Sequence, residues 1–229
     1  MTGIEKGPAK KARQHTVYKN AAGKRVPGVT TITGVMDKPA LVRWANKIGL
    51  EGIEVGKYVD ELATTGTLAH AMVENYINKI LDASCHDLDL NDYTPNQISL
   101  AENAVVSFYE WEKGKEITYI ATEQIMVSES MQVGGTSDII ARINGVLTLL
   151  DLKTCKAVYA DHFTQVGGGY YPILRENGHD IQDVRILRIG RDESEGFDDV
   201  KVPHLDLHMK RFKICRELYT INAEIRKSK

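Results

Sequence analysis

Three side chains capable of catalysis flank a predicted turn between two apolar segments. Asp138 ends the stretch GGTSD, whereas Asp151 and Lys153 follow the apolar residues 146–150. Side chains of a strand alternate between its two faces, so Asp151 and Lys153 share a face. Between the two segments, Asn144-Gly145 is a strong signal for a two-residue hairpin. The hairpin therefore predicts that Asp138 and Asp151 converge on adjacent antiparallel strands.

Two converging carboxylates repel each other unless a cation lies between them. Carboxylate oxygens suit a hard divalent cation, so the pair predicts bound Mg²⁺ or Mn²⁺. Lys153 beside such a cation could position a water molecule and stabilise negative charge on a phosphoryl group. An Asp-x-Lys triplet is common on exposed strands. Its place here is more informative, because ionised groups at the end of an apolar strand are costly without partners.

The ordered set of motifs resembles the PD-(D/E)XK nuclease superfamily, specifically its RecB-like and phage exonuclease branch. That family carries G-x-x-D, a hydrophobic strand and (D/E)-x-K, matched here by residues 135–138 and 151–153. The RecB-like branch also carries G-x-x-x-H on an upstream helix, matched by Gly66 and His70. The resemblance covers roughly residues 25–190. It implies a restriction-endonuclease-like fold and a catalytic core of Asp138, Asp151 and Lys153.

The resemblance implies further site residues. His70 would bind the metal with Asp138 and Asp151, and Glu123 corresponds to an acidic position that is frequent in these enzymes. Taken alone, a histidine in an amphipathic helix is more often a structural residue than a metal ligand. For Glu123, an exposed strand carboxylate is as good an interpretation as a metal ligand. Glu74, one helical turn after His70, is more simply read as a surface carboxylate.

Downstream, the family often carries Q-x-x-x-Y on the next helix. Gln165 matches the first position and would contact DNA or position the lysine, but residue 169 is glycine and the tyrosines follow at Tyr170 and Tyr171. This departure puts the role of the tyrosine in doubt. Tyr170, Tyr171 and Trp44 could stack on unpaired bases, although each of them is more often a core residue.

By resemblance, the expected activity is Mg²⁺- or Mn²⁺-dependent hydrolysis of DNA, by an exonuclease acting in recombination, repair or replication. Three alternatives remain open: a structure-selective or flap endonuclease, a non-catalytic DNA-binding protein on the same fold, and a phosphate-handling enzyme of another class. The last has weak support, because the sequence lacks a G-x-x-x-x-G-K-[ST] loop. No sequence feature argues for an oligomer.

Hydrophobic periodicity predicts the elements that must position these residues. We expect a small hairpin over residues 15–29, helices after Pro39 and over 55–81 and 95–113, and strands over 117–127, 135–143 and 146–153. A helix over 160–176, a strand over 184–189, a polar loop and a helix from Asp206 onward complete the order. In the second helix, Leu68, Met72, Tyr76 and Ile80 form a predicted core stripe. The fold class is α/β, an α+β sandwich with a central mixed sheet flanked by helices.

The bulk composition is that of an ordinary globular protein. The chain has 229 residues, 42% hydrophobic and 26% charged, which favours a single domain over residues 15–229 preceded by a flexible basic arm at 1–14. No apolar run approaches the roughly 20 residues of a membrane span. No secretory signal is visible, and three scattered cysteines fit no disulfide framework, so we expect a cytoplasmic protein. The net charge of −2 does not indicate nucleic-acid binding, but basic residues gather near both termini.

Overall fold

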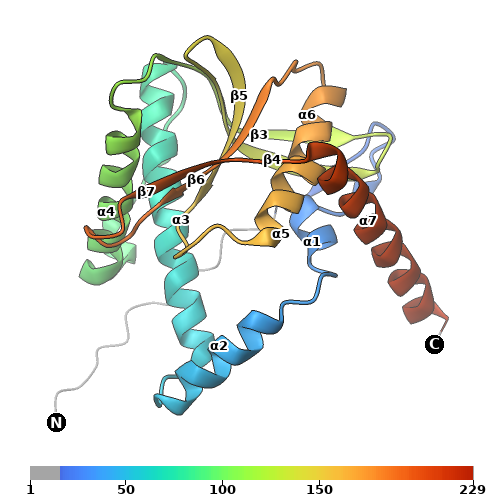
Figure 1. Cartoon of the computed structure of the whole chain (residues 1–229), viewed down its shortest axis with the longest axis horizontal. Helices are drawn as coiled ribbons and strands as arrows, with labels where there is room; N and C mark the ends of the chain where they lie inside the picture. The colour runs from blue at the N-terminus through green and yellow to red at the C-terminus, as the bar shows by residue number, and fades with distance from the viewer. Residues whose placement is uncertain (1–15, 229) are drawn as a thin grey trace.

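The computed structural model describes residues 16–228, and the basic arm predicted for residues 1–14 lies outside the described residues. The strands are β1 (Tyr18–Lys19), β2 (Arg25–Val26), β3 (Ile117–Ser128), β4 (Val133–Ile143), β5 (Val146–Lys153), β6 (Asp183–Ile189) and β7 (Phe197–Lys201). The helices are α1 (Val29–Thr33), α2 (Pro39–Leu50), α3 (Val55–Ile80), η1 (Leu90–Asp92), α4 (Pro95–Glu112), α5 (Ala160–Phe163), η2 (Thr164–Tyr170), α6 (Tyr171–Glu176) and α7 (Leu205–Lys227). Figure 1 shows their arrangement.

One five-stranded sheet lies at the centre, in the order β3-β4-β5-β6-β7. Every neighbouring pair is antiparallel except β5 and β6, which are parallel, so the sheet is mixed as predicted. The predicted hairpin between β4 and β5 is confirmed. Asn144 and Gly145 have φ values of 49° and 82°, and two positive φ angles are what the tight turn between twisted strands requires.

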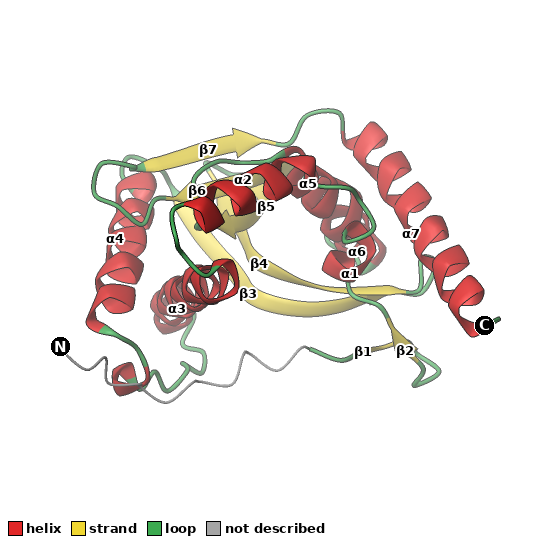
Figure 2. Cartoon of the chain, turned by 90° about the horizontal axis from the view of Figure 1, so that it is seen from below, coloured by secondary structure: helices red, strands yellow, loops and turns green. Residues whose placement is uncertain are grey.

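Helices cover both faces of the sheet (Figure 2). On one face, α3 and α4 pack against the sheet in a core that includes Phe108, Trp111 and Leu150. On the other face lie α1, η2, α6 and α7, and their core includes Leu149 and Phe212. Leu149 and Leu150 enter opposite cores because consecutive strand side chains point to opposite faces. The predicted fold class, a central mixed sheet flanked by helices, is confirmed.

The polar stretch after β6 was predicted to be a loop, and this prediction was wrong. Residues 197–201 form the edge strand β7, antiparallel to β6. Its sequence, FDDVK, lacks apolar alternation because an edge strand is half exposed. Arg185 pairs with Asp199 at 2.6 Å, and Arg188 pairs with Asp198. Cross-strand ion pairs therefore take the place of apolar packing in holding this strand.

The predicted helix over residues 160–176 is present but interrupted, because residues 164–170 form a π-helix. The three consecutive glycines lie in this segment, where backbone approaches backbone. A Cβ on Gly168 would lie 2.3 Å from the His208 carbonyl oxygen, and a Cβ on Gly169 would lie 2.4 Å from Val29. The glycines thus permit close packing of η2 on α7 and α1.

The core stripe predicted on α3 is only partly correct. Leu68 is buried, but Met72 and Tyr76 are half-buried and Ile80 is 55% exposed. Each step of four residues advances about 400° around a helix, so a strict four-residue series drifts off the buried face. The buried row instead combines steps of one, two and four residues, and it consists of Thr65, Gly66, Leu68, Ala69, Val73, Ile77 and Asn78.

The predicted start and end of α4 are confirmed. Thr94 accepts a hydrogen bond from the Gln97 N–H at 3.2 Å, and Gln97 in turn accepts one from the Thr94 N–H at 3.0 Å. This reciprocal capping satisfies two backbone donors that the first turn leaves free. Gly114, with φ of 74°, follows the helix. Among residues 16–228, no helix is long and apolar enough to cross a membrane.

Candidate metal centre

Three acidic residues occupy one row across the strands β3, β4 and β5. The pairs Thr122–Ile139 and Gln124–Ser137 set Glu123 opposite Asp138. The pairing of Ile139 with Leu150 continues to set Asp138 opposite Asp151. Opposed residues of antiparallel strands point to the same face. The strand pairing therefore brings three acidic residues to neighbouring positions on adjacent strands.

Glu123 reaches this row through irregular backbone. A β-bulge between Tyr119 and Ala121 inserts one extra residue into β3, which changes the face to which later residues point. Glu123 itself has φ of 45°, a left-handed conformation that costs a non-glycine residue about 1–3 kcal/mol. Such strain persists only where the surrounding structure holds it. The backbone is thus arranged to present this carboxylate beside Asp138.

His70 joins two of the carboxylates from the helix α3. Its Nδ1 lies 3.9 Å from Asp138 Oδ1. His70, Glu123 and Asp138 each offer one ligand atom, and these atoms all lie within 4.8 Å of one another. Two carboxylate oxygens with one imidazole nitrogen suit Mn²⁺ well, and Mg²⁺ through the oxygens. The donor set therefore fits a divalent cation.

A glycine on α3 allows His70 to approach the sheet. A Cβ on Gly66 would lie 2.7 Å from Thr154 Oγ1, directly after the end of β5. Any larger residue would push the helix away from the strand end. In the G-x-x-x-H pattern, Gly66 is thus explained by close packing against Thr154, and His70 by its place in the carboxylate–histidine cluster.

Both oxygens of Asp138 are oriented by neighbours. Oδ1 faces His70, whereas Oδ2 accepts a 2.8 Å hydrogen bond from the backbone N–H of Leu152. The Leu152 N–H belongs to the same short segment as Asp151 and Lys153. The hairpin therefore fixes the direction of this carboxylate as well as its position.

Asp151 and Lys153 form a buried ion pair next to this row. The Asp151 side chain is 2% exposed and that of Lys153 is 18% exposed, and Lys153 Nζ donates to Asp151 Oδ2. Burial raises the pKa of Asp151, and the neighbouring Asp138 carboxylate raises it further while Lys153 opposes the change. Burial also disfavours charged Lys153, but the two carboxylates outweigh that effect and raise its pKa. Lys153 is therefore held as a cation.

Asp151 does not belong to the three-ligand group found among residues 16–228. Its Oδ2 is engaged by Lys153. The structure places it beside Asp138, at the position expected from the hairpin, and its role as a metal ligand stays a prediction.

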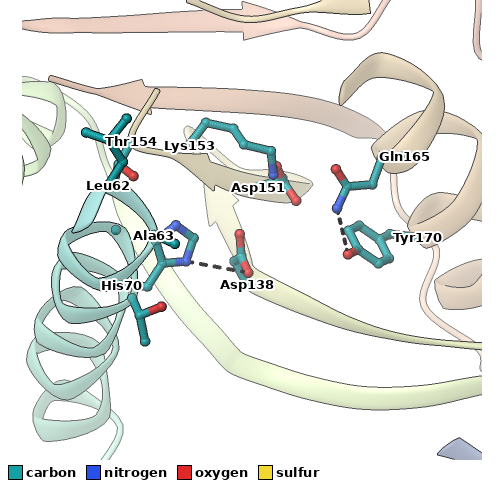
Figure 3. Close-up of a pocket in the computed structure, with 11 residues that line it drawn as sticks. Leu62, Ala63, His70, Asp138, Asp151, Lys153, Thr154, Gln165 and Tyr170 are labelled. Atoms are coloured by element: carbon teal, nitrogen blue, oxygen red, sulfur yellow. Dashed lines mark hydrogen bonds and ion pairs between the residues drawn. The ribbon is translucent and has the colours of Figure 1, made fainter. Parts of the chain in front are cut away.

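On the opposite side of the site, Gln165 and Tyr170 lie on the π-helix η2. Gln165 Nε2 donates a 2.9 Å hydrogen bond to the Tyr170 hydroxyl (Figure 3). Tyr170 is 9% exposed, and burial together with the Asp151 and Asp138 carboxylates raises the pKa of its hydroxyl well above the usual value. Tyr170 therefore stays protonated, so its hydroxyl keeps a proton that it can donate. Gly135 makes room for it, because a Cβ there would lie 2.8 Å from the ring.

All of these side chains except Glu123 line one pocket of about 360 Å³. In Figure 3, His70 and Asp138 face each other, and Lys153 and Asp151 lie between them and the Gln165–Tyr170 pair. The lining residues are Leu62, Ala63, Gly66, Thr67, His70, Asp138, Asp151, Lys153, Thr154, Gln165 and Tyr170. Sequence reasoning missed Thr67 and Thr154. Their signals were weak: Thr67 precedes His70 by one helical turn, and Thr154 directly follows Lys153.

Other residues singled out in the sequence lie elsewhere. Trp44 packs against Tyr58, with ring centroids 6.0 Å apart, where α2 meets α3. The Tyr171 ring lies beneath the Arg175 guanidinium. Glu74 was interpreted as a surface carboxylate, but its side chain is only 10% exposed and its Oε2 lies 2.8 Å from His86 Nε2.

The fold and the site together define an α/β protein with a carboxylate–histidine cluster beside a buried lysine–aspartate pair. No protein-family model matches the sequence, and no curated protein matches it. Among solved structures, the alkaline exonuclease LHK-Exo from Laribacter hongkongensis is similar with a TM-score of 0.38 and 10% identity, over 71% of this chain and 87% of that chain. The protein SSO0001 is similar with a TM-score of 0.31 and 13% identity, over 70% and 74%. Similarity at this level assigns neither a family nor a function.

Proposed function

We propose that this protein is a Mg²⁺- or Mn²⁺-dependent deoxyribonuclease that removes nucleotides from DNA ends. The observation that carries the proposal is the convergence of His70, Glu123 and Asp138 within 4.8 Å, next to a lysine whose charge is maintained by two carboxylates. Metal-dependent phosphodiester hydrolysis uses both features, a place for a divalent cation and a positive group for the phosphoryl oxygens. The ordered G-x-x-x-H, G-x-x-D and D-x-K motifs support the same activity by resemblance.

His70, Glu123 and Asp138 would hold the cation, and Asp151 is a further proposed ligand. A cation bound there lowers the pKa of a coordinated water and neutralises charge on the phosphate. Lys153 donates to the attacking water or to a phosphoryl oxygen and stabilises negative charge that develops in the transition state. Tyr170, kept protonated and oriented by Gln165, supplies a second donor to the scissile phosphate.

Nuclease activity is tested with end-labelled linear duplex DNA and closed circular DNA, each with Mg²⁺ or Mn²⁺. The wild type should release labelled nucleotides from the linear DNA and leave the circle intact. The variants Asp151→Ala and Lys153→Ala should lose activity by roughly 100-fold or more, whereas Lys79→Ala, on the exposed end of α3, should retain it. Activity that survives both site substitutions excludes the mechanism. Cleavage of the circle favours an endonuclease, and binding of DNA without hydrolysis favours a non-catalytic protein.

The cation site is tested separately by calorimetric titration of the protein with Mn²⁺. We expect binding by the wild type, and at least about 10-fold weaker binding by His70→Ala and Glu123→Gln because each loses a ligand atom. Asp60→Asn removes an exposed carboxylate from the same helix α3 as a matched control. Equal affinities in all four proteins contradict the assigned ligands.

A further inference from the structure

The C-terminal helix α7 carries a row of exposed aliphatic side chains on a different side from its buried residues. Its buried side holds Phe212 and Cys215. The exposed row consists of Leu207, Ile214, Leu218, Ile221 and Ile225, which are 58%, 57%, 43%, 45% and 51% exposed. Single exposed apolar residues are normal, but a continuous row indicates a surface that binds a partner. Figures 1 and 2 show α7 along the outer edge of the molecule.

The spacing of this row is that of a coiled coil. From Ile214 to Ile225 the steps are four, three and four residues, and Leu207 lies one heptad before Ile214. Arg211 occupies the remaining position of the repeat. Apolar residues at only two of every seven positions form a narrow stripe, here called the seam, which is typical of a helix that pairs with one other helix. A helix that lies on a membrane has a broader apolar face.

The seam is complementary to itself when one copy is reversed. When two copies of α7 run antiparallel with residue 216 of one opposite residue 216 of the other, Ile214 lies opposite Leu218 of the second copy. Leu207 then lies opposite Ile225. Arg211 then lies opposite Ile221, and one polar residue in an apolar seam is a common device for fixing register. Leu207, Ile214 and Ile221 occupy one seam position of the seven-residue repeat, and Arg211, Leu218 and Ile225 occupy the other. Each contact thus joins one position to the other, as antiparallel pairing requires.

The charges beside the seam fit the same arrangement. Lys210 and Glu224 lie on one edge of the seam, seven residues before and after Glu217. Reversal sets Lys210 of each copy near Glu224 of the other, giving two opposite-charge pairs. Glu217 of the two copies meet at the centre, where like charges are unfavourable.

We propose that α7 pairs with α7 of a second copy in an antiparallel coiled coil, so that the protein forms a homodimer. The eleven residues that line the pocket include none from α7, so the pairing helix is not part of the pocket lining. The proposal does not depend on the nuclease activity.

The oligomeric state is measured by analytical ultracentrifugation of the full chain from micromolar to hundreds of micromolar concentrations. The wild type should be a dimer. Ile214→Glu/Leu218→Glu should weaken dimerisation by about 100-fold or more, because it places charges without partners in the seam. Circular dichroism should remain unchanged, since both side chains are exposed in the single copy. Lys213→Glu changes an exposed residue of α7 outside the seam and should dimerise normally.

The antiparallel register is tested by exchanging charges. Lys210→Glu and Glu224→Lys should each weaken the dimer by roughly 3–10-fold, and the double variant should restore it. Glu217→Gln should tighten the dimer, because it removes the central repulsion.

A wild type that stays monomeric overturns the proposal, and so does a dimer that survives Ile214→Glu/Leu218→Glu. A monomer that binds vesicles of anionic lipid would assign the row to a membrane instead. A dimer in which the double charge exchange fails to restore affinity excludes the antiparallel register.

Discussion

The Gln165 amide donates a 2.9 Å hydrogen bond to the Tyr170 hydroxyl, five residues further along a π-helix. In an α-helix, residues four apart share a face, whereas in a π-helix the corresponding spacing is five. The sequence departs from the expected Q-x-x-x-Y pattern by one residue, and the π-helix compensates for that residue. The displaced tyrosine thus faces the acidic row after all.

Tyr170→Phe should lower the turnover number for DNA hydrolysis by roughly 10–100-fold, the effect of losing one hydrogen bond to a charged group. The thermal midpoint Tm should change little, because the ring remains. Steady-state kinetics on linear DNA measures the effect. Tyr171→Phe, at the adjacent residue that begins α6, is the matched control. Equal rates for the two variants would remove Tyr170 from the proposed machinery.

Gly66→Ala should impair Mn²⁺ binding and activity, because the new Cβ meets Thr154 Oγ1 at 2.7 Å and displaces α3 with His70. Adding Thr154→Ala removes the obstructing atom. The double variant should recover metal binding, and it should be more stable than Thr154→Ala alone by about 0.5–1 kcal/mol because alanine favours the helix more than glycine does. Calorimetry and thermal unfolding measure the two effects. If Thr154→Ala gives no rescue, the close approach is not what positions His70.

Lys153→Met should destabilise the fold by about 3–5 kcal/mol, because the buried Asp151 carboxylate loses its partner. The double variant Lys153→Met/Asp151→Asn should be less destabilised than the single one. Urea denaturation gives the coupling from a double-mutant cycle. The exposed pair Glu110–Lys113 provides the comparison, with an expected coupling of only about 0.2–0.5 kcal/mol. Additive effects at Asp151 and Lys153 would contradict the burial of this pair.

Glu176 should make folding sensitive to acid. Burial acts to raise its pKa, but hydrogen bonds from the Ser128 hydroxyl at 2.5 Å and the Ser130 hydroxyl at 2.7 Å outweigh burial and lower the pKa. A carboxyl whose pKa is lower in the folded state stabilises the protein above its unfolded pKa of about 4.5, and this contribution is lost as the pH falls through the folded value.

Glu176→Gln should therefore cost about 1 kcal/mol of unfolding free energy at pH 7, after allowance for solvent screening, and progressively less as the pH falls below about 4.5. Glu102→Gln, an exposed glutamate of α4, should show no such dependence. A difference between Glu176→Gln and wild type that is constant with pH contradicts the assignment.

The sequence predicted the parts of the site that depend on local rules. Asn144-Gly145 dictates a two-residue turn, and this turn sets Asp138 opposite Asp151 without any information from distant residues. The face shared by Asp151 and Lys153 follows from strand alternation. The sheet class and most helices were predictable for the same reason, because their apolar periodicity is strong.

The remaining features depend on contacts between distant segments. Whether Glu123 faces the site is decided by the bulge near Ile120 and by a positive φ, and neither follows from strand alternation. The strand β7 is held by ion pairs with Arg185 and Arg188 rather than by apolar residues. The π-helix arises where glycines let η2 approach α7 and α1, which no local pattern specifies.

The parallel pairing of β5 with β6 has a consequence for how the site is assembled during folding. The hairpin of β4 and β5 closes through a two-residue turn, whereas β6 can pair only after the chain has crossed over through α5, η2 and α6. Local contacts form faster than distant ones. We expect the acidic row to form early and the Gln165–Tyr170 pair late, in an order that pulsed hydrogen exchange during refolding can resolve. The two halves of the pocket would then belong to different stages of one folding reaction.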